Sequence, residues 1–443
     1  MIIYKGQLLE NDQLNRVMEE LEEWSLKAVE RREHIAKQVI AACDKLSGYI
    51  AQGKYQEIIK PLLEQGLFSD DQLQEATQFF SEKNLKYRYD LELGILEDQV
   101  AKLNAENPLM KRKILPQGVL FHIAAGNAQG LPFFSVIEGM LTGNINILKL
   151  PSADNGISVL LMYELIRIEP KLADYICVLD VPSTDVIAMK KLAGFADAVV
   201  VWGGDEAIKA VRMFADPSTQ IISWGHKLSF AYVSAKSLEW FLQEIKEGKT
   251  PKMLMNLADH ICSTKQVLCS SCQGIFAETT DERLLLEFGE AFADILEKES
   301  HKYPENSIGV RGKISLKQYN DRMEEWGKSE SEINETIKRG GVSVTVSMKQ
   351  ELTLSDMFCN CYVRPMPKDR IIPVLKGQRG YLQTVGLMCM DEEWEEYTDK
   401  FMRAGVTRIC QPKDMSKTEI GGTHDGEYPL RRYTRVAESC RGS

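Results

Sequence analysis

The chain has 443 residues, with 54 Lys and Arg against 64 Asp and Glu, which gives a net charge of −10, and 44% of its residues are hydrophobic. This length corresponds to roughly two or three domains of about 150 residues, and a core of that size needs neither disulfides nor a metal. The composition therefore excludes a small stapled scaffold. The acidic balance argues against a nucleic-acid partner, because nucleic acids are bound mainly through clustered Lys and Arg.

The apolar runs of the chain are short. Residues 118–125 and 198–202 form two of the longest runs, and both fall far below the ~20 residues that a membrane span needs. Residues 1–10 lack the basic flank and the cleavage site of a signal peptide. We therefore expect no membrane span and a cytoplasmic location, in which the ten cysteines would be reduced.

The first part of the chain has a helical pattern. Residues 14–105 are rich in Glu, Lys, Gln and Leu, and the apolar residues of segments 17–29 and 36–50 recur at three- and four-residue spacing. This spacing predicts several amphipathic helices. The sequence Pro-Gln-Gly at 116–118 then marks a break, after which short apolar runs alternate with helical stretches.

The middle of the chain predicts parallel βαβ units, because its strand-like segments are nearly continuous runs of Val, Ile and Leu. The predicted strands are 119–123, 146–150, 175–179, 198–202, 221–222 and 230–233. The predicted helices between them are 131–141, 158–168, 185–192 and 205–213. A doubly wound α/β domain is the architecture that this alternation favours.

The last third predicts a second α/β domain. Its expected helices are 252–260, 283–299 and 316–326, and its expected strands are 274–277, 342–348 and 360–363. The fold class is thus α/β, with two doubly wound domains and a helical N-terminal segment.

Three candidate ligand-binding turns follow predicted strands, where open α/β sheets collect ligands. Asn127 offers an amide after the first strand, Lys149 and Ser152 place an ammonium and a hydroxyl after the second, and Gly203 and Gly204 precede a helix whose amides could hold an anion. Each segment also has a plain structural interpretation: the first is a turn, the second a solvated lysine and the third an ordinary loop. The usual G-x-G-x-x-G dinucleotide motif is absent.

Residues 260–273 form the densest segment of sulfur and polar groups. A zinc site could use the C-x-x-C pair Cys269 and Cys272 with Cys262, with His260 or with the pair at 359 and 361. Alternatively, one cysteine is a nucleophile, because a thiolate attacks carbonyl groups and thioesters and leaves readily. Inert buried thiols are the third interpretation, and the segment alone leaves all three open.

The motifs taken in order resemble the aldehyde dehydrogenase superfamily and, within it, the LuxC-type fatty acyl-CoA reductases of bacterial bioluminescence. The resemblance depends on FHIAAGN at 121–127, LTGN at 141–144 with LKLPS at 148–152, LCSS at 268–271, YLQTVG at 381–386 and HDG at 424–426. It implies an aldehyde dehydrogenase-like fold and a cytoplasmic, homo-oligomeric enzyme that reduces an acyl-CoA to the aldehyde.

The resemblance also implies roles for single residues. Cys269 matches the nucleophile that would form a thioester with the acyl group and expel coenzyme A. Asn127 matches the side chain that stabilises the tetrahedral oxyanion together with the Cys269 backbone N–H. Lys149 and Ser152 match positions at the adenosine ribose, and the neutral Ser152 favours NADPH, because a glutamate there would repel its 2′-phosphate. Gly203 and Gly204 match the pyrophosphate-facing helix start.

One departure from the superfamily is informative. Aldehyde-oxidising members carry Glu-Leu-Gly-Gly-Lys, whose glutamate activates the hydrolytic water, whereas this chain has SWGHK at 223–227. The missing general base favours reduction of an acyl thioester over oxidation of an aldehyde. His424 lies in the part of the chain that matches the family's C-terminal region, where it is either a site residue or part of a turn. Cys272 stands where the family commonly has proline.

We expect a helical segment at 1–110 packed on a cofactor domain at 111–249, a catalytic domain at 250–425, and a tail at 426–443 that contacts another subunit. The resemblance makes an acyl-activating synthetase a plausible partner. Two alternatives remain open: a superfamily enzyme that uses Cys269 on an acyl phosphate or a free aldehyde, and a zinc-stabilised, non-catalytic α/β scaffold.

Overall fold

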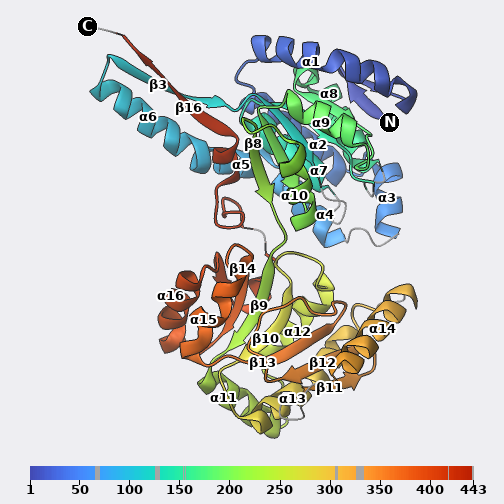
Figure 1. Ribbon diagram of the computed structural model, residues 1–443, viewed down its shortest axis with the longest axis vertical. Coiled ribbons are helices and arrows are strands. Elements are labelled where there is room, and N and C mark those ends of the chain that lie inside the picture. Colours follow the sequence, from blue (N-terminus) through green and yellow to red (C-terminus); the bar gives the residue numbers. More distant parts are fainter. Residues whose placement is uncertain are drawn as a thin grey trace. The chain divides into compact units, whose positions relative to one another are not determined.

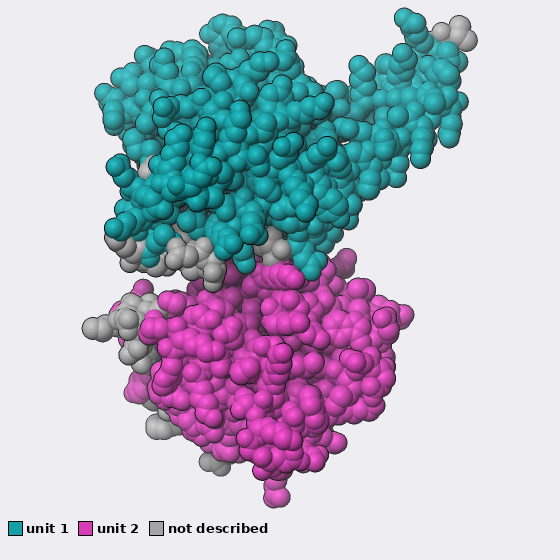
Figure 2. Space-filling view, turned by 180° about the vertical axis from the view of Figure 1, so that it is seen from behind, with its two compact units in different colours: residues 1–225, 419–443 teal, residues 226–418 magenta. Residues whose placement is uncertain are grey.

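The computed structural model describes residues 1–64, 70–124, 130–152, 154, 156–304, 308–325, 334–417 and 419–441. The chain divides into two compact units, coloured separately in Figure 2: unit 1 contains Met1–Gly225 and Glu419–Ser443, and unit 2 contains His226–Thr418. The boundary therefore precedes the one expected after residue 249. The reason is that the strand at 228–233 pairs only with strands of unit 2.

Unit 1 is built on a seven-stranded sheet in the order β2-β1-β6-β5-β4-β7-β8. Its strands are β1 (Ile2–Tyr4), β2 (Gln7–Leu9), β4 (Val119–Ile123), β5 (Ile145–Lys149), β6 (Ile176–Leu179), β7 (Ala198–Trp202) and β8 (Gln220–Trp224). The strands β4 to β8 are parallel, as predicted. The hairpin of β1 and β2 was not predicted, and it adds an antiparallel edge to β6.

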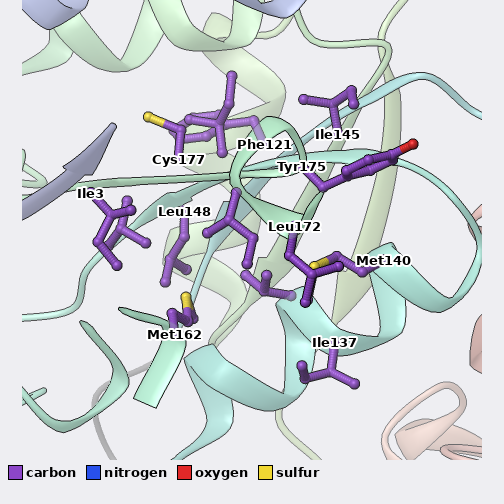
Figure 3. Close-up of a cluster of buried hydrophobic side chains, with 14 of the residues drawn as sticks. Ile3, Phe121, Ile137, Met140, Ile145, Leu148, Met162, Leu172, Tyr175 and Cys177 are labelled. Atoms are coloured by element: carbon purple, nitrogen blue, oxygen red, sulfur yellow. The ribbon is translucent and has the colours of Figure 1, made fainter. Parts of the chain in front are cut away.

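The helices of unit 1 come from both the N-terminal segment and the βαβ units (Figure 1). They are α1 (Leu14–Arg31), α2 (Ala36–Ala51), α3 (Gln56–Glu64), α4 (Asp70–Phe79), α5 (Glu82–Tyr89), the π-helical turn η2 (Asp90–Gly94), α6 (Ile95–Glu106), α7 (Leu131–Leu141), α8 (Ile157–Ile168), α9 (Val186–Gly194), α10 (Asp205–Phe214) and α17 (Pro429–Arg432). Figure 3 shows part of the shared core, which includes Phe121 and Leu148 of the sheet and Ile137 of α7.

Two strands far apart in sequence form a separate ribbon in unit 1. They are β3 (Met110–Pro116) and β16 (Thr434–Cys440), which pair antiparallel along their whole length. With α6 they extend away from the rest of unit 1 (Figure 1). The C-terminal segment, expected to be a tail, therefore returns to the unit that contains the N-terminus.

Unit 2 contains a second seven-stranded sheet, ordered β11-β12-β13-β10-β9-β14-β15 and parallel except at the β11 edge. The strands are β9 (Leu228–Val233), β10 (Cys272–Ala277), β11 (Asn334–Arg339), β12 (Val342–Ser347), β13 (Asn360–Pro365), β14 (Leu382–Met388) and β15 (Arg408–Cys410). The helices are α11 (Ala235–Lys246), α12 (Lys252–Thr264), α13 (Glu282–Ser300), α14 (Ile308–Glu325), α15 (Ile371–Leu375) and α16 (Trp394–Ala404).

In both sheets the strand order reverses beside the first parallel strand, which is β4 in unit 1 and β9 in unit 2. The reversal lies between β4 and β7 in unit 1 and between β9 and β14 in unit 2. The doubly wound α/β architecture predicted for both domains is thus confirmed. Among the helices that the structure describes, none combines the length and the apolar character needed to cross a bilayer.

A buried charged cluster attaches the C-terminal segment to unit 1. Arg88 donates to Glu92 over 2.8 Å and also pairs with Glu138, and all three side chains are buried. Glu92 accepts the backbone N–H of Leu430 over 2.7 Å, and Tyr433 donates to Glu138 over 3.3 Å. Burial raises the pKa of Glu138, and the Arg88 guanidinium opposes that shift. Arg88 is therefore the cation that makes two buried carboxylates tolerable.

We expect Arg88→Leu to lower the stability of the protein by about 3–5 kcal/mol, because the substitution leaves two buried carboxylates without their cation. Urea unfolding followed by circular dichroism measures the change. Arg167→Leu is the control, since it breaks an exposed pair with Glu164 that contributes only about 0–1 kcal/mol. Equal unfolding midpoints for the two variants would contradict this assignment.

Candidate active site

Cys269 lies in the turn that joins α12 to β10, and its side chain is exposed. The neighbouring cysteines Cys262 and Cys272 are buried. Burial raises the pKa of the Cys272 thiol to about 12, which disfavours its thiolate form. Of the thiols between residues 260 and 273, Cys269 is therefore the one that a substrate can reach.

Strands on both sides of the sheet's reversal point hold the backbone of this turn. Ser229, near the start of β9, donates its hydroxyl to the Cys269 carbonyl over 2.7 Å. The same Ser229 oxygen accepts the backbone N–H of Thr384 in β14 over 3.1 Å. Cys269 thus stands at the amino ends of β9, β10 and β14, whereas the ligand-binding turns predicted from the sequence follow carboxyl ends of strands.

Buried amide side chains fix the residues on either side of Cys269. Gln266 donates to the Cys272 carbonyl over 3.0 Å and to the Ser355 hydroxyl over 3.1 Å. Gln273 donates to the Gln266 carbonyl over 3.1 Å and accepts from the Ser355 hydroxyl over 2.8 Å. All three side chains are buried, so their hydrogen bonds specify one conformation of the loop.

The backbone before Cys269 is strained. Lys265 and Gln266 have φ values of 48° and 60°, a region that non-glycine residues rarely adopt. A second strained segment, Met357 to Cys359, has φ values of 61°, 49° and 65°, and its Phe358 N–H donates to the Lys265 carbonyl over 3.0 Å. Such strain persists only where surrounding contacts enforce it, and it concentrates at functional sites.

Lys149 ends β5 in unit 1 and is only 3% exposed, so it is not the solvated surface lysine of the alternative interpretation. Its Nζ donates to the Ser183 hydroxyl over 2.8 Å. Burial lowers the Lys149 pKa, and Asp180 opposes this shift. Ser183 follows β6 at the same sheet edge, so the strand-end rule applied to that strand would have found it.

The other cofactor candidates lie at this same carboxyl edge. Ser152 is exposed in the turn after β5, and Gly203 and Gly204 connect β7 to α10. A Cβ on Gly204 would point into open space. The first turn of α10 carries Asp205 and Glu206, which suit the helix dipole but would repel an anion at that end. Asn127 lies outside the described residues.

His424 lies in unit 1 beside the ends of β7 and β8. Its ring meets Trp202 and Trp224 edge-on, at 5.3 and 4.9 Å between ring centres. Asp425 and Gly426 have φ values of 52° and 83° and form a tight turn in which His424 pairs with Glu427. The Asp-Gly turn was one interpretation of this segment, and the turn places the His424 ring at the sheet edge.

The zinc alternative is not supported by the geometry. Over the ranges that the structure describes, which include residues 260–273, 359 and 361, no three His, Cys, Asp or Glu side chains are arranged to hold a metal ion.

The structure gathers Lys149, Ser152, Gly203 and Gly204 at one edge of the unit 1 sheet, and it places Cys269 in unit 2. Ser229 and Ser355 were missed, because their contacts with the thiol loop come from distant segments.

Comparison with known proteins identifies both the family and the fold. The acyl-CoA reductase (LuxC) family matches residues 33–436. The long-chain acyl-protein thioester reductase of Aliivibrio fischeri is 26% identical over 341 residues, and that of Vibrio harveyi is 24% identical over 342 residues. Each alignment covers 74% of this chain but only 65% of the relative's length.

Solved structures of aldehyde dehydrogenases share the fold. Aldehyde dehydrogenase 21 from Physcomitrella patens is similar with a TM-score of 0.65 at 12% identity, covering 98% of this chain and 91% of its own. Lactaldehyde dehydrogenase from Escherichia coli is similar with a TM-score of 0.59 at 15% identity, covering 98% and 90%. The fold is thus aldehyde dehydrogenase-like, and the family match over most of the chain shows that this protein belongs to the acyl-CoA reductase (LuxC) family.

Proposed function

We propose that this protein reduces a long-chain acyl thioester to the aldehyde, with NADPH as the reductant and with a thioester on Cys269 as the intermediate. The observation that carries the proposal is an exposed thiol on a loop that buried hydrogen bonds hold in one conformation. Family membership supports the reaction class.

Cys269 acts as the nucleophile in this proposal. Its thiolate attacks the carbonyl carbon of the acyl donor, and the tetrahedral oxyanion accepts hydrogen bonds from the Asn127 amide and the Cys269 backbone N–H. The C–S bond to the donor then breaks, and the departing thiolate takes up a proton, so that coenzyme A is released when the donor is acyl-CoA. After reduction of the enzyme thioester, the thiohemiacetal collapses to free aldehyde and returns the thiolate of Cys269.

The donors at the carboxyl edge of unit 1 fit a nicotinamide cofactor. Lys149 and Ser183 provide a buried ammonium and a hydroxyl, and Ser152 provides an exposed hydroxyl. The open space at Gly204 leaves the start of α10 accessible, whereas Asp205 and Glu206 in its first turn oppose an anion there. When bound, the cofactor supplies the hydride that reduces the thioester. Ser152 carries no charge, so a 2′-phosphate held by Lys149 would meet a hydroxyl at this position instead of a carboxylate, which favours NADPH over NADH.

The residue at the position of the hydrolytic glutamate supports reduction. Ser223 stands there, in β8, and offers a hydroxyl in place of a carboxylate. In an enzyme that transfers hydride to its acyl intermediate, the missing glutamate protects that intermediate, because a water activated by a glutamate would hydrolyse it. Oxidation of free aldehyde and reduction of an acyl phosphate are the alternatives within the same fold, and both would also use Cys269.

The acyl donor could be a coenzyme A thioester or a thioester on a carrier protein. The family description names acyl-CoA, whereas the relatives' names specify acyl-protein thioesters. Both donors present the same carbonyl to Cys269 and differ only in the leaving thiol. A carrier-protein donor would make an acyl-activating synthetase the natural partner. We also propose a homo-oligomer whose subunits contact one another through the β3–β16 ribbon.

We expect Cys269→Ala to reduce turnover by at least about 10³-fold, because it removes the thiol that forms the acyl intermediate. Absorbance of NADPH, followed with acyl-CoA substrates of increasing chain length, measures the loss. Cys440→Ala removes another exposed thiol and should leave turnover unchanged. Activity retained in Cys269→Ala would exclude the covalent route.

We expect Asn127→Ala to lower kcat by about 10²–10³-fold, since it removes one of the two donors to the oxyanion. The dissociation constant for NADPH, measured by fluorescence titration, should stay within about twofold. A variant that keeps the kcat of the wild type would show that Asn127 has no part in stabilising the oxyanion.

We expect Ser152→Glu to lower the ratio of kcat/KM for NADPH to that for NADH by about tenfold or more, because the carboxylate repels the 2′-phosphate. Ser152→Gln is the matched control, since glutamine has the same size without the charge. If the two variants change the ratio equally, charge at this position does not select the cofactor.

A further inference from the structure

The surface around Cys269 is rich in exposed apolar side chains. In the part of unit 2 that the structure describes, five of the eight exposed large hydrophobic side chains lie on three segments: 266–271, 353–359 and α14. They are Val267, Leu268, Leu354, Leu316 and Tyr319. Single exposed apolar side chains are ordinary, whereas a gathering of them beside a reactive group indicates a binding surface.

Val267 and Leu354 belong to different segments, which a buried hydrogen bond brings together. Gln266 donates to the Ser355 hydroxyl over 3.1 Å, and each of the two apolar residues is the direct neighbour of one of these partners. Val267 also lies only two residues before Cys269. The covalent chain therefore keeps Val267 beside the thiol, and the hydrogen bond keeps Leu354 in the same neighbourhood.

The two segments carry almost no charge. Asp356 is the one charged residue within 266–271 and 353–359, and it pairs with Lys317 of α14 over 2.5 Å. The ion pair neutralises this carboxylate and attaches α14 to the strained segment. The next residue along α14 towards its start, Leu316, is 61% exposed and extends the apolar character of this part of unit 2.

Of the reactants in the proposed reaction, only the acyl chain is apolar along its length. The nicotinamide cofactor and coenzyme A both carry phosphates, which lose hydration at an apolar surface and gain no partner there. The hydrocarbon of an acyl group has no such cost. Once the acyl carbonyl is bonded to the Cys269 sulfur, the first methylenes of the chain must lie next to the residues that flank this thiol.

We propose that Val267, Leu268 and Leu354 form the surface on which the hydrocarbon chain of the acyl substrate lies, and that this surface selects long chains over short ones. The inference rests on the proposed function, because the thioester on Cys269 is what brings the chain to these residues. Each methylene removed from water strengthens binding by about fourfold, so even partial cover of the chain discriminates strongly between lengths.

The test compares acylation by butanoyl-CoA and by dodecanoyl-CoA in the absence of NADPH, measured as release of thiol. Leu354→Asn and Val267→Thr replace apolar side chains with polar ones of similar size, and Leu354→Met keeps the surface apolar. Leu26→Asn is the matched control, because Leu26 is 61% exposed on α1 of unit 1. The quantity compared is the ratio of the two second-order acylation rate constants, dodecanoyl to butanoyl.

We expect Leu354→Asn and Val267→Thr each to lower this ratio by about fivefold or more, since each removes apolar cover from one or two methylenes. Leu354→Met and Leu26→Asn should keep the ratio within about twofold of the wild type. Ratios that stay unchanged in both polar variants overturn the inference, as does an equal loss of rate with both donors, which would show a general disturbance of the loop.

The wild type separates this inference from the proposed function. A protein that acylates Cys269 equally fast with both donors contradicts the inference alone. A protein whose Cys269 is alkylated by iodoacetamide but releases no thiol from either donor contradicts the proposed function, and the inference with it.

Discussion

The hydrogen bonds that fix the Cys269 loop are the constraint on which the proposed chemistry depends. An irregular turn at a sheet edge has many conformations, and only buried partners can select one of them. Gln266, Gln273 and Ser355 do this from one side, and Ser229 does it from β9. A buried polar group left unpaired costs about 1–3 kcal/mol, so alternative loop conformations are penalised several times over. The loop can therefore hold a strained backbone and an exposed thiol together.

The wound parts of the fold could be predicted from the sequence, because strands buried on both faces are continuous apolar runs. The strands Val119–Ile123 and Ala198–Trp202 and the helix Leu131–Leu141 begin and end where they were expected. The β3–β16 ribbon could not be predicted, since neither strand has a local sequence pattern that indicates which distant strand it pairs with. The unit to which β9 belongs depends on long-range pairing in the same way, because its partners β10 and β14 decide to which sheet it belongs.

In the candidate site, too, some features could be predicted from the sequence and others are seen only in the structure. Cys269 and Lys149 were found from motifs, and the structure adds that one is exposed and the other buried. The groups that control them are single serines, Ser229 and Ser183, which come from other strands. A serine in a strand has no distinctive pattern, so only the assembled sheet shows what it contacts. Sequence motifs thus indicate the candidate groups, whereas tertiary structure shows how they are held.

The central claim is that the acyl group passes through a thioester on Cys269. The most direct measurement is the mass of the intact protein after incubation with a long-chain acyl-CoA in the absence of NADPH, followed by peptide mapping. The account predicts one added acyl group, located on the peptide that contains Cys269 and removed when NADPH is supplied. An unmodified protein that still consumes NADPH with the same acyl-CoA, or an acyl group on another residue, would contradict the account.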